Sequence, residues 1–199
     1  MKLHLGCGDI YLDGWINVDV KSPNTYLAKT NKEKADYNRT TIDDYYKYDY
    51  WKTKPTTTRN KKFTVVDEYW NLLEIPYPYD DDSIEEILIV GAFEHFSKEE
   101  GEELLREWYR ILKPQGRLYI DIPDLYGTFK MFFDADTLEE MDWAVRLVYG
   151  SQKNKYSFHK WGYNFYTLSD ICKEIGFRET EEVDIIKHEY PMFMLKAVK

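Results

Sequence analysis

Residues 3–20, LHLGCGDIYLDGWINVDV, decide the fold of this chain. A short apolar strand runs directly into Gly6-Cys7-Gly8, and a second apolar run ends in Asp19 and Val20. Glycines at positions 6 and 8 let the backbone turn sharply and approach a ligand closely, because glycine has no Cβ atom. A carboxylate at the second strand tip can accept hydrogen bonds from two vicinal ribose hydroxyls. The pattern therefore indicates a nucleoside-containing ligand that lies across two neighbouring strand ends.

Two other nucleotide-binding motifs do not fit this stretch. A dinucleotide fold requires G-x-G-x-x-G, and Tyr11 occupies the position of the third glycine. A phosphate-binding loop of the form G-x-x-x-x-G-K-[ST] is absent from the sequence. Taken alone, Gly6-Cys7-Gly8 could be a plain tight turn between a strand and a helix, but the pairing with Asp19 favours a binding site.

Short apolar strands alternate with amphipathic helices outward from this stretch. The expected strands are Lys2–Leu5, Trp15–Val20, Phe63–Val66, Ile84–Val90, Arg117–Ile122, Glu182–Ile186 and Met192–Val198. Capping boxes predict helices that begin at Ser97 and Thr137, and a third apolar stripe predicts a helix over Leu168–Ile175.

The alternation predicts an α/β fold with a doubly wound, mostly parallel sheet of seven strands. The last two strands have no helix between them, so we expect an antiparallel pair at one sheet edge. Ligands of such sheets bind at the carboxyl ends of the strands.

Length and composition agree with one globular domain over residues 1–199. The chain has 199 residues, 43% hydrophobic content and a formal net charge of -9, which disfavours nucleic acid as a partner. No run of 18 apolar residues predicts a membrane span. The N-terminus lacks the pattern of a secretory signal, and the two cysteines lie in unlike contexts, so we expect a cytoplasmic protein.

Residues 21–62 form a basic, aromatic segment that interrupts the pattern. The segment holds 11 Lys and Arg against 5 Asp and Glu, and it includes several tyrosines and Trp51. We expect an insertion or lid over the sheet edge. Three interpretations stay open: a solvated insertion, an acceptor-binding surface that stacks aromatic rings, and a nucleic-acid contact, which the acidic remainder of the chain opposes.

The sequence resembles the class I S-adenosylmethionine-dependent methyltransferases. The opening stretch is similar to the first two motifs of that superfamily. The resemblance continues in NLLEIPYPYDDDSIEEI, in IVGAFEHFSKEEGEELLREWYRILKPQGRLYIDIPD and in HKWGYNFYTLSDICKEIGF. A small subgroup of predicted methyltransferases shares the elements GWINVD, EHF, LKP-x-G and PD. The resemblance spans nearly the whole chain except residues 21–62, and it implies a Rossmann-like methyltransferase sheet with S-adenosylmethionine as cofactor.

The resemblance also implies cofactor-binding residues. The loop Gly6, Cys7 and Gly8 would face the methionine part of the cofactor, and Asp19, with Val20 beside it, would bind the ribose. Asn71 and Leu72 would contact the adenine, with Asn71 where the family usually has Asp. Gly91 and Ala92 would border the transferring methyl group.

Two departures from the family pattern are visible. His4 replaces an acidic residue often found two positions before the first glycine. The usual N-terminal helices over the site are also missing, so residues 21–62 and 125–162 are the candidates to shield it.

Catalytic candidates stand at the same strand ends: Glu94, His95, Asp124 and His159. A hydroxyl acceptor must lose a proton, and His95 is the foremost candidate base because of its intrinsic pKa. Each residue has an alternative role: Glu94 in structural pairing, His95 in orienting its loop, Asp124 in holding a turn, and His159 in a packed aromatic segment. These four residues could together bind a divalent metal, but no ligand spacing such as two histidines at i and i+4 supports this, so we expect no metal site.

The sequence thus predicts a methyltransferase that acts on a small or carbohydrate-like acceptor at oxygen or nitrogen. The alternatives are a methyltransferase of protein or nucleic acid and a methyltransferase-like binding protein without catalysis. A nicotinamide-dependent oxidoreductase is disfavoured by Tyr11.

Overall fold

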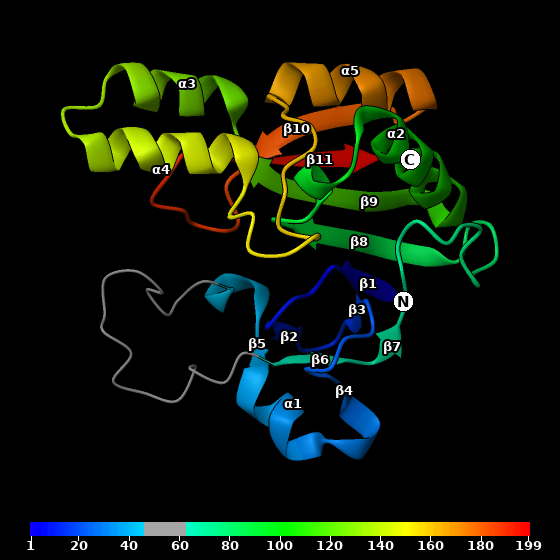
Figure 1. Ribbon diagram of the computed structural model, residues 1–199. Coiled ribbons are helices and arrows are strands. Elements are labelled where there is room, and N and C mark those ends of the chain that lie inside the picture. The colour runs from blue at the N-terminus through cyan, green and yellow to red at the C-terminus, as the bar shows by residue number, and fades with distance from the viewer. Residues whose placement is uncertain (46–62) are drawn as a thin grey trace.

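A seven-stranded sheet forms the centre of the computed structural model, which describes residues 1–45 and 63–199 (Figure 1). The strand order is β10-β11-β9-β8-β1-β3-β7. The strands are β1 (Lys2–Leu5), β3 (Ile16–Asp19), β7 (Glu68–Tyr69), β8 (Ile84–Val90), β9 (Leu112–Pro123), β10 (Glu179–Val183) and β11 (Met192–Val198). From β9 to β7 all neighbours are parallel, and β11 is antiparallel to both β9 and β10. The predicted doubly wound sheet with a terminal antiparallel strand pair is confirmed.

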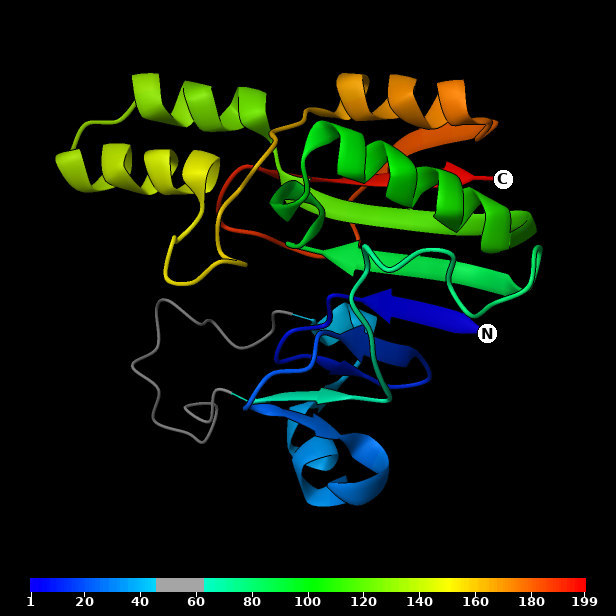
Figure 2. The ribbon, with the colours of Figure 1, turned by 45° about the vertical axis from the view of Figure 1, so that its right-hand side comes forward.

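Helices are unevenly distributed around this sheet. Helices α2 (Lys98–Ile111) and α5 (Phe165–Ile175) pack on one face, and α3 (Leu125–Phe133) and α4 (Leu138–Tyr149) lie side by side beyond the ends of β8 and β9 (Figures 1 and 2). The remaining elements are α1 (Lys32–Asn38), the 3₁₀ turns η1 (Ala28–Thr30), η2 (Ile42–Asp44) and η3 (Phe93–His95), and the paired short strands β2 (Tyr11–Leu12) with β5 (Arg39–Thr40) and β4 (Thr25–Leu27) with β6 (Thr64–Val66). Among the described residues, no helix has the length and apolar character that a membrane crossing requires.

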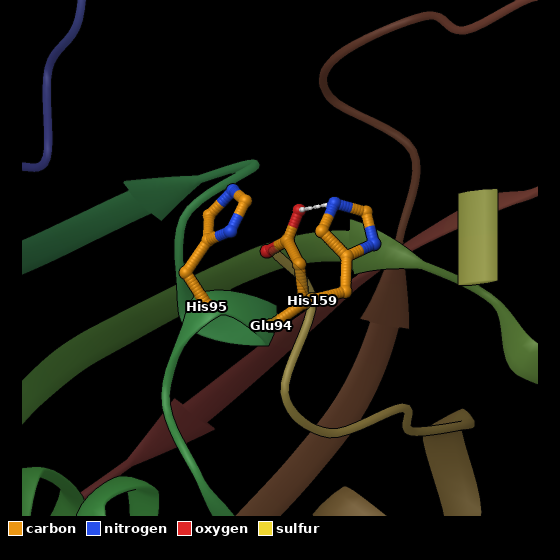
Figure 3. A group of neighbouring side chains, drawn as sticks. All are labelled: Glu94, His95 and His159. Carbon is orange, nitrogen blue, oxygen red and sulfur yellow. Dashed lines mark ion pairs between the residues drawn. The ribbon is translucent and has the colours of Figure 1, made fainter. Parts of the chain in front are cut away.

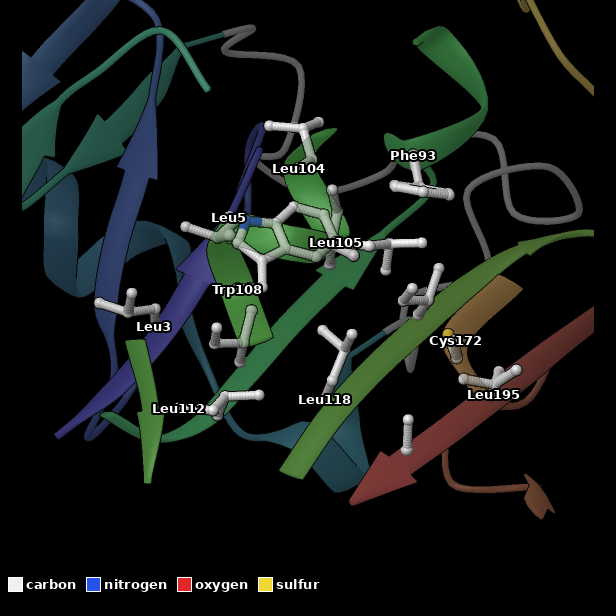
Figure 4. Packing of buried hydrophobic residues seen from close by; sticks show 14 of the residues in the cluster. Leu3, Leu5, Phe93, Leu104, Leu105, Trp108, Leu112, Leu118, Cys172 and Leu195 are labelled. Atoms are coloured by element: carbon white, nitrogen blue, oxygen red, sulfur yellow. The ribbon is translucent and has the colours of Figure 1, made fainter. Parts of the chain in front are cut away.

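The main core lies between the sheet and α2. Leu104, Leu105 and Trp108 of this helix are fully buried against Leu3, Leu5 and their neighbours on the strands (Figure 4). The helix begins where the sequence predicts, because Ser97 and Glu100 form a complete capping box. Burial of one apolar helix face against the strands fixes α2, and it thereby fixes the loop between β8 and α2.

The other face of the sheet has a smaller core without a long helix in the described ranges. Tyr45, from the end of the described part of the basic segment, and Ile186, from the link between β10 and β11, cover Leu88, Val90 and Tyr119 there. Residues from the described part of the basic segment thus cover part of this sheet face. Tyr46, Tyr48, Tyr50 and Trp51 of that segment lie outside the described residues, and the insertion or lid stays a prediction.

Several details differ from the sequence-based prediction, among them the start of α5 at Phe165 instead of Leu168, because the capping box of Asn164 begins the helix earlier. Strand β10 lies three residues earlier than expected, because Ile186 packs into the smaller core and leaves the polar run Glu179–Val183 as an edge strand. Residues 64–66 pair with β4 outside the main sheet, whose edge is β7. Strand β9 starts before Arg117, with residues 113–116 bulging from its pairing with β8. Helix α3 was not predicted, because its aromatic residues have no clear apolar period; the N-cap Asp124 starts it.

His4 links the basic segment to the centre of the sheet. This fully buried side chain contacts Oδ1 of Asn17 through Nδ1 at 3.0 Å and the hydroxyl of Tyr45 through Nε2 at 2.7 Å. Oδ1 of Asn17 also accepts from the backbone N–H of Leu12, so Nδ1 of His4 carries the hydrogen and Nε2 accepts from Tyr45. The acidic residue that the family often has here is thus replaced by a neutral imidazole with a structural role.

We predict that His4 makes the fold sensitive to acid. Burial lowers its pKa to about 4 from an ordinary 6.5, so the unfolded chain takes up a proton first as the pH falls. The contribution of His4 to stability is therefore complete above pH 6.5 and declines towards pH 4, by about 1.4 kcal/mol for each pH unit. Urea unfolding should show the gap between wild type and His4→Asn shrinking by roughly 2–3 kcal/mol from pH 7 to pH 4. A gap that stays constant over this range would contradict the assignment.

Candidate active site

The glycine loop after β1 and the acidic end of β3 are joined directly. The backbone N–H of Gly8 donates to Oδ2 of Asp19 at 2.8 Å, and that of Val20 donates to Oδ1 at 2.7 Å. Burial raises the pKa of the Asp19 carboxyl, and these two hydrogen bonds oppose the rise. Each carboxylate oxygen keeps a further lone pair, so the group can still accept from ribose hydroxyls.

The two glycines of this loop have different roles. Both have a positive φ, +61° at Gly6 and +56° at Gly8. A Cβ atom on Gly6 would lie 2.9 Å from the Cβ of Ala92, so this glycine lets the loops after β1 and β8 pack together. A Cβ atom on Gly8 would meet no atom within 4 Å. The space beside Gly8 is therefore open to a ligand, as a loop that holds a nucleoside cofactor requires.

The other cofactor candidates surround the same edge of the sheet. Cys7 offers only its backbone, because its thiol is buried near the carbonyl of Val65 and burial raises its pKa. Asn71 is exposed, whereas the Leu72 side chain belongs to the core. Gly91 follows β8 and donates its N–H to the carbonyl of Asp121 on β9 at 2.8 Å.

Three of the four catalytic candidates lie together. Glu94 and His95 belong to η3, directly after Gly91 and Ala92, and His159 arrives from the loop before α5 (Figure 3). Oε1 of Glu94 lies 3.8 Å from Nε2 of His159, and the ring centroids of the two histidines are 4.8 Å apart. The sequence prediction that these residues share a site is consistent with this geometry, although their catalytic roles stay predictions.

Glu94 is an unusual carboxyl group. Its side chain is buried, and Oε2 has no hydrogen-bond partner among the described residues. Burial raises its pKa to about 8, and the nearby Asp121 adds to the rise. The group is therefore mainly protonated near neutral pH.

The backbone fixes both histidine rings. Nδ1 of His159 donates to the carbonyl of Leu147 at 2.8 Å, and Nδ1 of His95 donates to the carbonyl of Phe158 at 2.8 Å. Burial lowers the pKa of His159 to about 4 and lowers that of His95 as well. Both rings are thus neutral, with Nε2 as the remaining acceptor.

Asp124 does not join this group. Its carboxylate caps α3 by accepting from the N–H groups of Tyr126 and Gly127. This contact matches the turn-holding alternative for Asp124.

Asp121 and His188 are not among the residues predicted from the sequence, and Oδ1 of Asp121 lies 2.9 Å from Nε2 of His188, buried near Glu94. The signal was an Asp inside the otherwise apolar run LYIDI, since an acid on a buried strand requires a partner.

Two cavities meet at His159. One, of about 300 Å³, is lined by Glu94, His159 and Lys160 together with the aromatic rings of Phe129, Tyr149 and Trp161. The other, of about 230 Å³, is lined by His95, His159 and Arg146 among others. The cluster therefore separates two spaces that small molecules can enter.

Comparison with known proteins identifies the family. The family model described as a methyltransferase domain matches residues 3–120. The chain belongs to this methyltransferase family. It is an S-adenosylmethionine-dependent enzyme, and its glycine loop and Asp19 fit that cofactor.

Solved structures share the fold of this methyltransferase. A Thermotoga maritima protein described as a possible histamine N-methyltransferase has a TM-score of 0.53 at 14% identity, with 100% of this chain and 81% of that chain covered. Human N-acetylserotonin methyltransferase, solved with S-adenosylmethionine, has a TM-score of 0.53 at 10% identity, with 100% of this chain but only 47% of that chain covered. No curated protein matches the methyltransferase in sequence.

We predict that Gly8→Ala impairs cofactor binding more than folding. A Cβ atom there enters the open space beside the loop, and it should weaken S-adenosylhomocysteine binding at least ~10-fold, or about 1.4 kcal/mol. Gly14→Ala is the matched control, because Gly14 also has a positive φ, +79°, and open space around it. Each variant should lose roughly 1–2 kcal/mol of stability from backbone strain. Equal affinities of both variants by calorimetry would exclude Gly8 from the cofactor site.

Proposed function

We propose that this methyltransferase modifies a hydroxyl or amine of a small or carbohydrate-like acceptor that binds in the larger cavity. The observation that carries the proposal is the position of this cavity, which reaches Glu94 and His159 beside the loop after β8. Its volume of about 300 Å³ lies at the lower end of the range for small-molecule sites.

The walls of the cavity suit a ring-shaped acceptor. Phe129, Tyr149 and Trp161 offer partly exposed aromatic faces, which stack on sugar or aromatic rings. Lys160 also lines the cavity, its ammonium group pairs with Glu100 at 2.9 Å, and its backbone N–H donates to the carbonyl of Glu94 at 2.8 Å. This backbone hydrogen bond fixes the side of the cavity around Lys160 to Glu94. Glu94 lies shortly after Gly91 and Ala92, which the family resemblance places beside the methyl group.

The reaction requires alignment and removal of a proton. The bound cofactor supplies an electrophilic methyl group on a sulfonium sulfur. With the cofactor bound, Glu94, His95 and His159 would orient the oxygen or nitrogen of the acceptor towards the methyl group and exclude water. The acceptor would give its proton to Nε2 of the neutral His95 ring, whose Nδ1 donates to the carbonyl of Phe158.

The direct test is methyl transfer from labelled S-adenosylmethionine to a panel of sugars, phenols and small amines, with protein and RNA as competing classes. Label in a small compound supports the proposal. Label in protein or RNA alone would replace it with a macromolecular acceptor.

We predict that Trp161→Ala raises the KM for the acceptor. Loss of the aromatic wall should raise KM at least ~10-fold, since stacking contributes about 0.5–1.5 kcal/mol beyond area burial. Affinity for S-adenosylhomocysteine should stay unchanged. Tyr166→Ala is the control, because Tyr166 is 77% exposed on α5 and does not line the cavity. Similar KM values for both variants would place the acceptor elsewhere.

We also predict that His95→Ala lowers kcat by roughly 100-fold, with cofactor affinity nearly unchanged. The ring contacts the loop that holds His159, and it lines the smaller cavity. If cofactor affinity instead falls in parallel with kcat, His95 only orients its loop.

A further inference from the structure

Three potential ligand atoms converge at the junction of the two cavities. Glu94, His95 and His159 each contribute one donor atom, and these atoms lie within 4.8 Å of one another (Figure 3). Two imidazole nitrogens and one carboxylate oxygen form the donor set of many catalytic zinc sites. These three residues are among the four candidates at the strand ends, but no spacing in the sequence supports a metal site, because the ligands come from two loops and the i, i+4 spacing applies to one helix.

The environment of the two histidines is that of metal ligands. Nδ1 of each ring donates to a backbone carbonyl at 2.8 Å, of Phe158 for His95 and of Leu147 for His159. Such a contact fixes the ring and its tautomer, as in most metal-binding histidines.

Glu94 supplies the independent observation. The residue is only 5% exposed, and its Oε2 has no hydrogen-bond partner among the described residues. A buried carboxyl oxygen without a partner is unfavourable, and a cation beside it would remove that cost.

We propose that Glu94, His95 and His159 bind one divalent transition-metal ion of the zinc class, with an open position towards the cavities. Tetrahedral zinc places neighbouring ligand atoms about 3.4 Å apart. The 3.8 Å between Oε1 of Glu94 and Nε2 of His159 is close to that value. The largest separation of the three ligand atoms, up to 4.8 Å, requires small side-chain rotations.

This inference extends the proposed function, because the open position would receive the acceptor oxygen or nitrogen. His95 then acts as a ligand and not as the proton acceptor that the sequence indicates. Cavities on both sides of His159 give the ion and the acceptor access to the site.

The test is a titration of cobalt(II) into protein without an affinity tag and stripped by a chelator, with neither cofactor nor acceptor present. We expect saturable binding of one equivalent with visible absorption from a site of low coordination number. Glu94→Gln should bind cobalt at least ~10-fold more weakly, yet it should fold normally without metal, because the amide has nearly the size and shape of the carboxyl group that it replaces. Glu103→Gln, at an exposed acid on α2, is the matched control and should bind like wild type.

His159→Gln changes a ligand on the other loop and should show the same loss, which covers the case that Glu94→Gln fails to fold. Absence of cobalt binding, or equal binding by wild type and both ligand variants, would overturn the proposal. Affinity for S-adenosylhomocysteine, measured on the metal-free protein, tests the cofactor site separately, so failure of the metal site would leave the methyltransferase assignment untouched.

Discussion

The hydrogen bond from the backbone N–H of Gly8 to the carboxylate of Asp19 is the contact on which the cofactor side of the site depends. It joins the carboxyl ends of β1 and β3, which are parallel neighbours with Leu5 opposite Val18. Because β1 also pairs with β8, the loop after β8 reaches the same edge, where Ala92 packs against Gly6. The central position of β1 in the sheet thus brings together the loops that would hold the nucleoside and those that border its methyl group.

The acceptor side is assembled in a different way, from segments far apart along the chain. The carbonyl of Glu94 accepts from the N–H of Lys160, and the carbonyl of Phe158 accepts from His95. Gly150 ends α4 with a positive φ, +77°, and a Cβ atom there would collide with the carbonyl of Ser157. The turn after α4 therefore sets where His159 enters the site.

The bounds of a strand or the start of a helix were predictable where one local sequence signal had one physical meaning. Strands β1, β8 and β11 have the predicted bounds, because each is a continuous apolar run, and the capping boxes at Ser97 and Thr137 mark true helix starts. Sequence-based prediction failed for β10, whose polar edge sequence has no alternation, and for α3, whose aromatic residues remain partly exposed.

The site was predictable only in part, for a related reason. Glycines and Asp19 follow strands directly, so topology alone places them, whereas the approach of His159 to Glu94 depends on a long loop. The pair of Asp121 and His188 depends on the link after β10, and pairings of this kind leave no spacing in the sequence.

We propose that one edge of the sheet binds the cofactor and directs its methyl group towards Glu94, His95 and His159. The decisive experiment is a crystal structure with S-adenosylhomocysteine. We expect both ribose hydroxyls on the carboxylate of Asp19 and the sulfur facing the loop from Gly91 to His95. Binding elsewhere, or a sulfur that points away from this cluster, would contradict it.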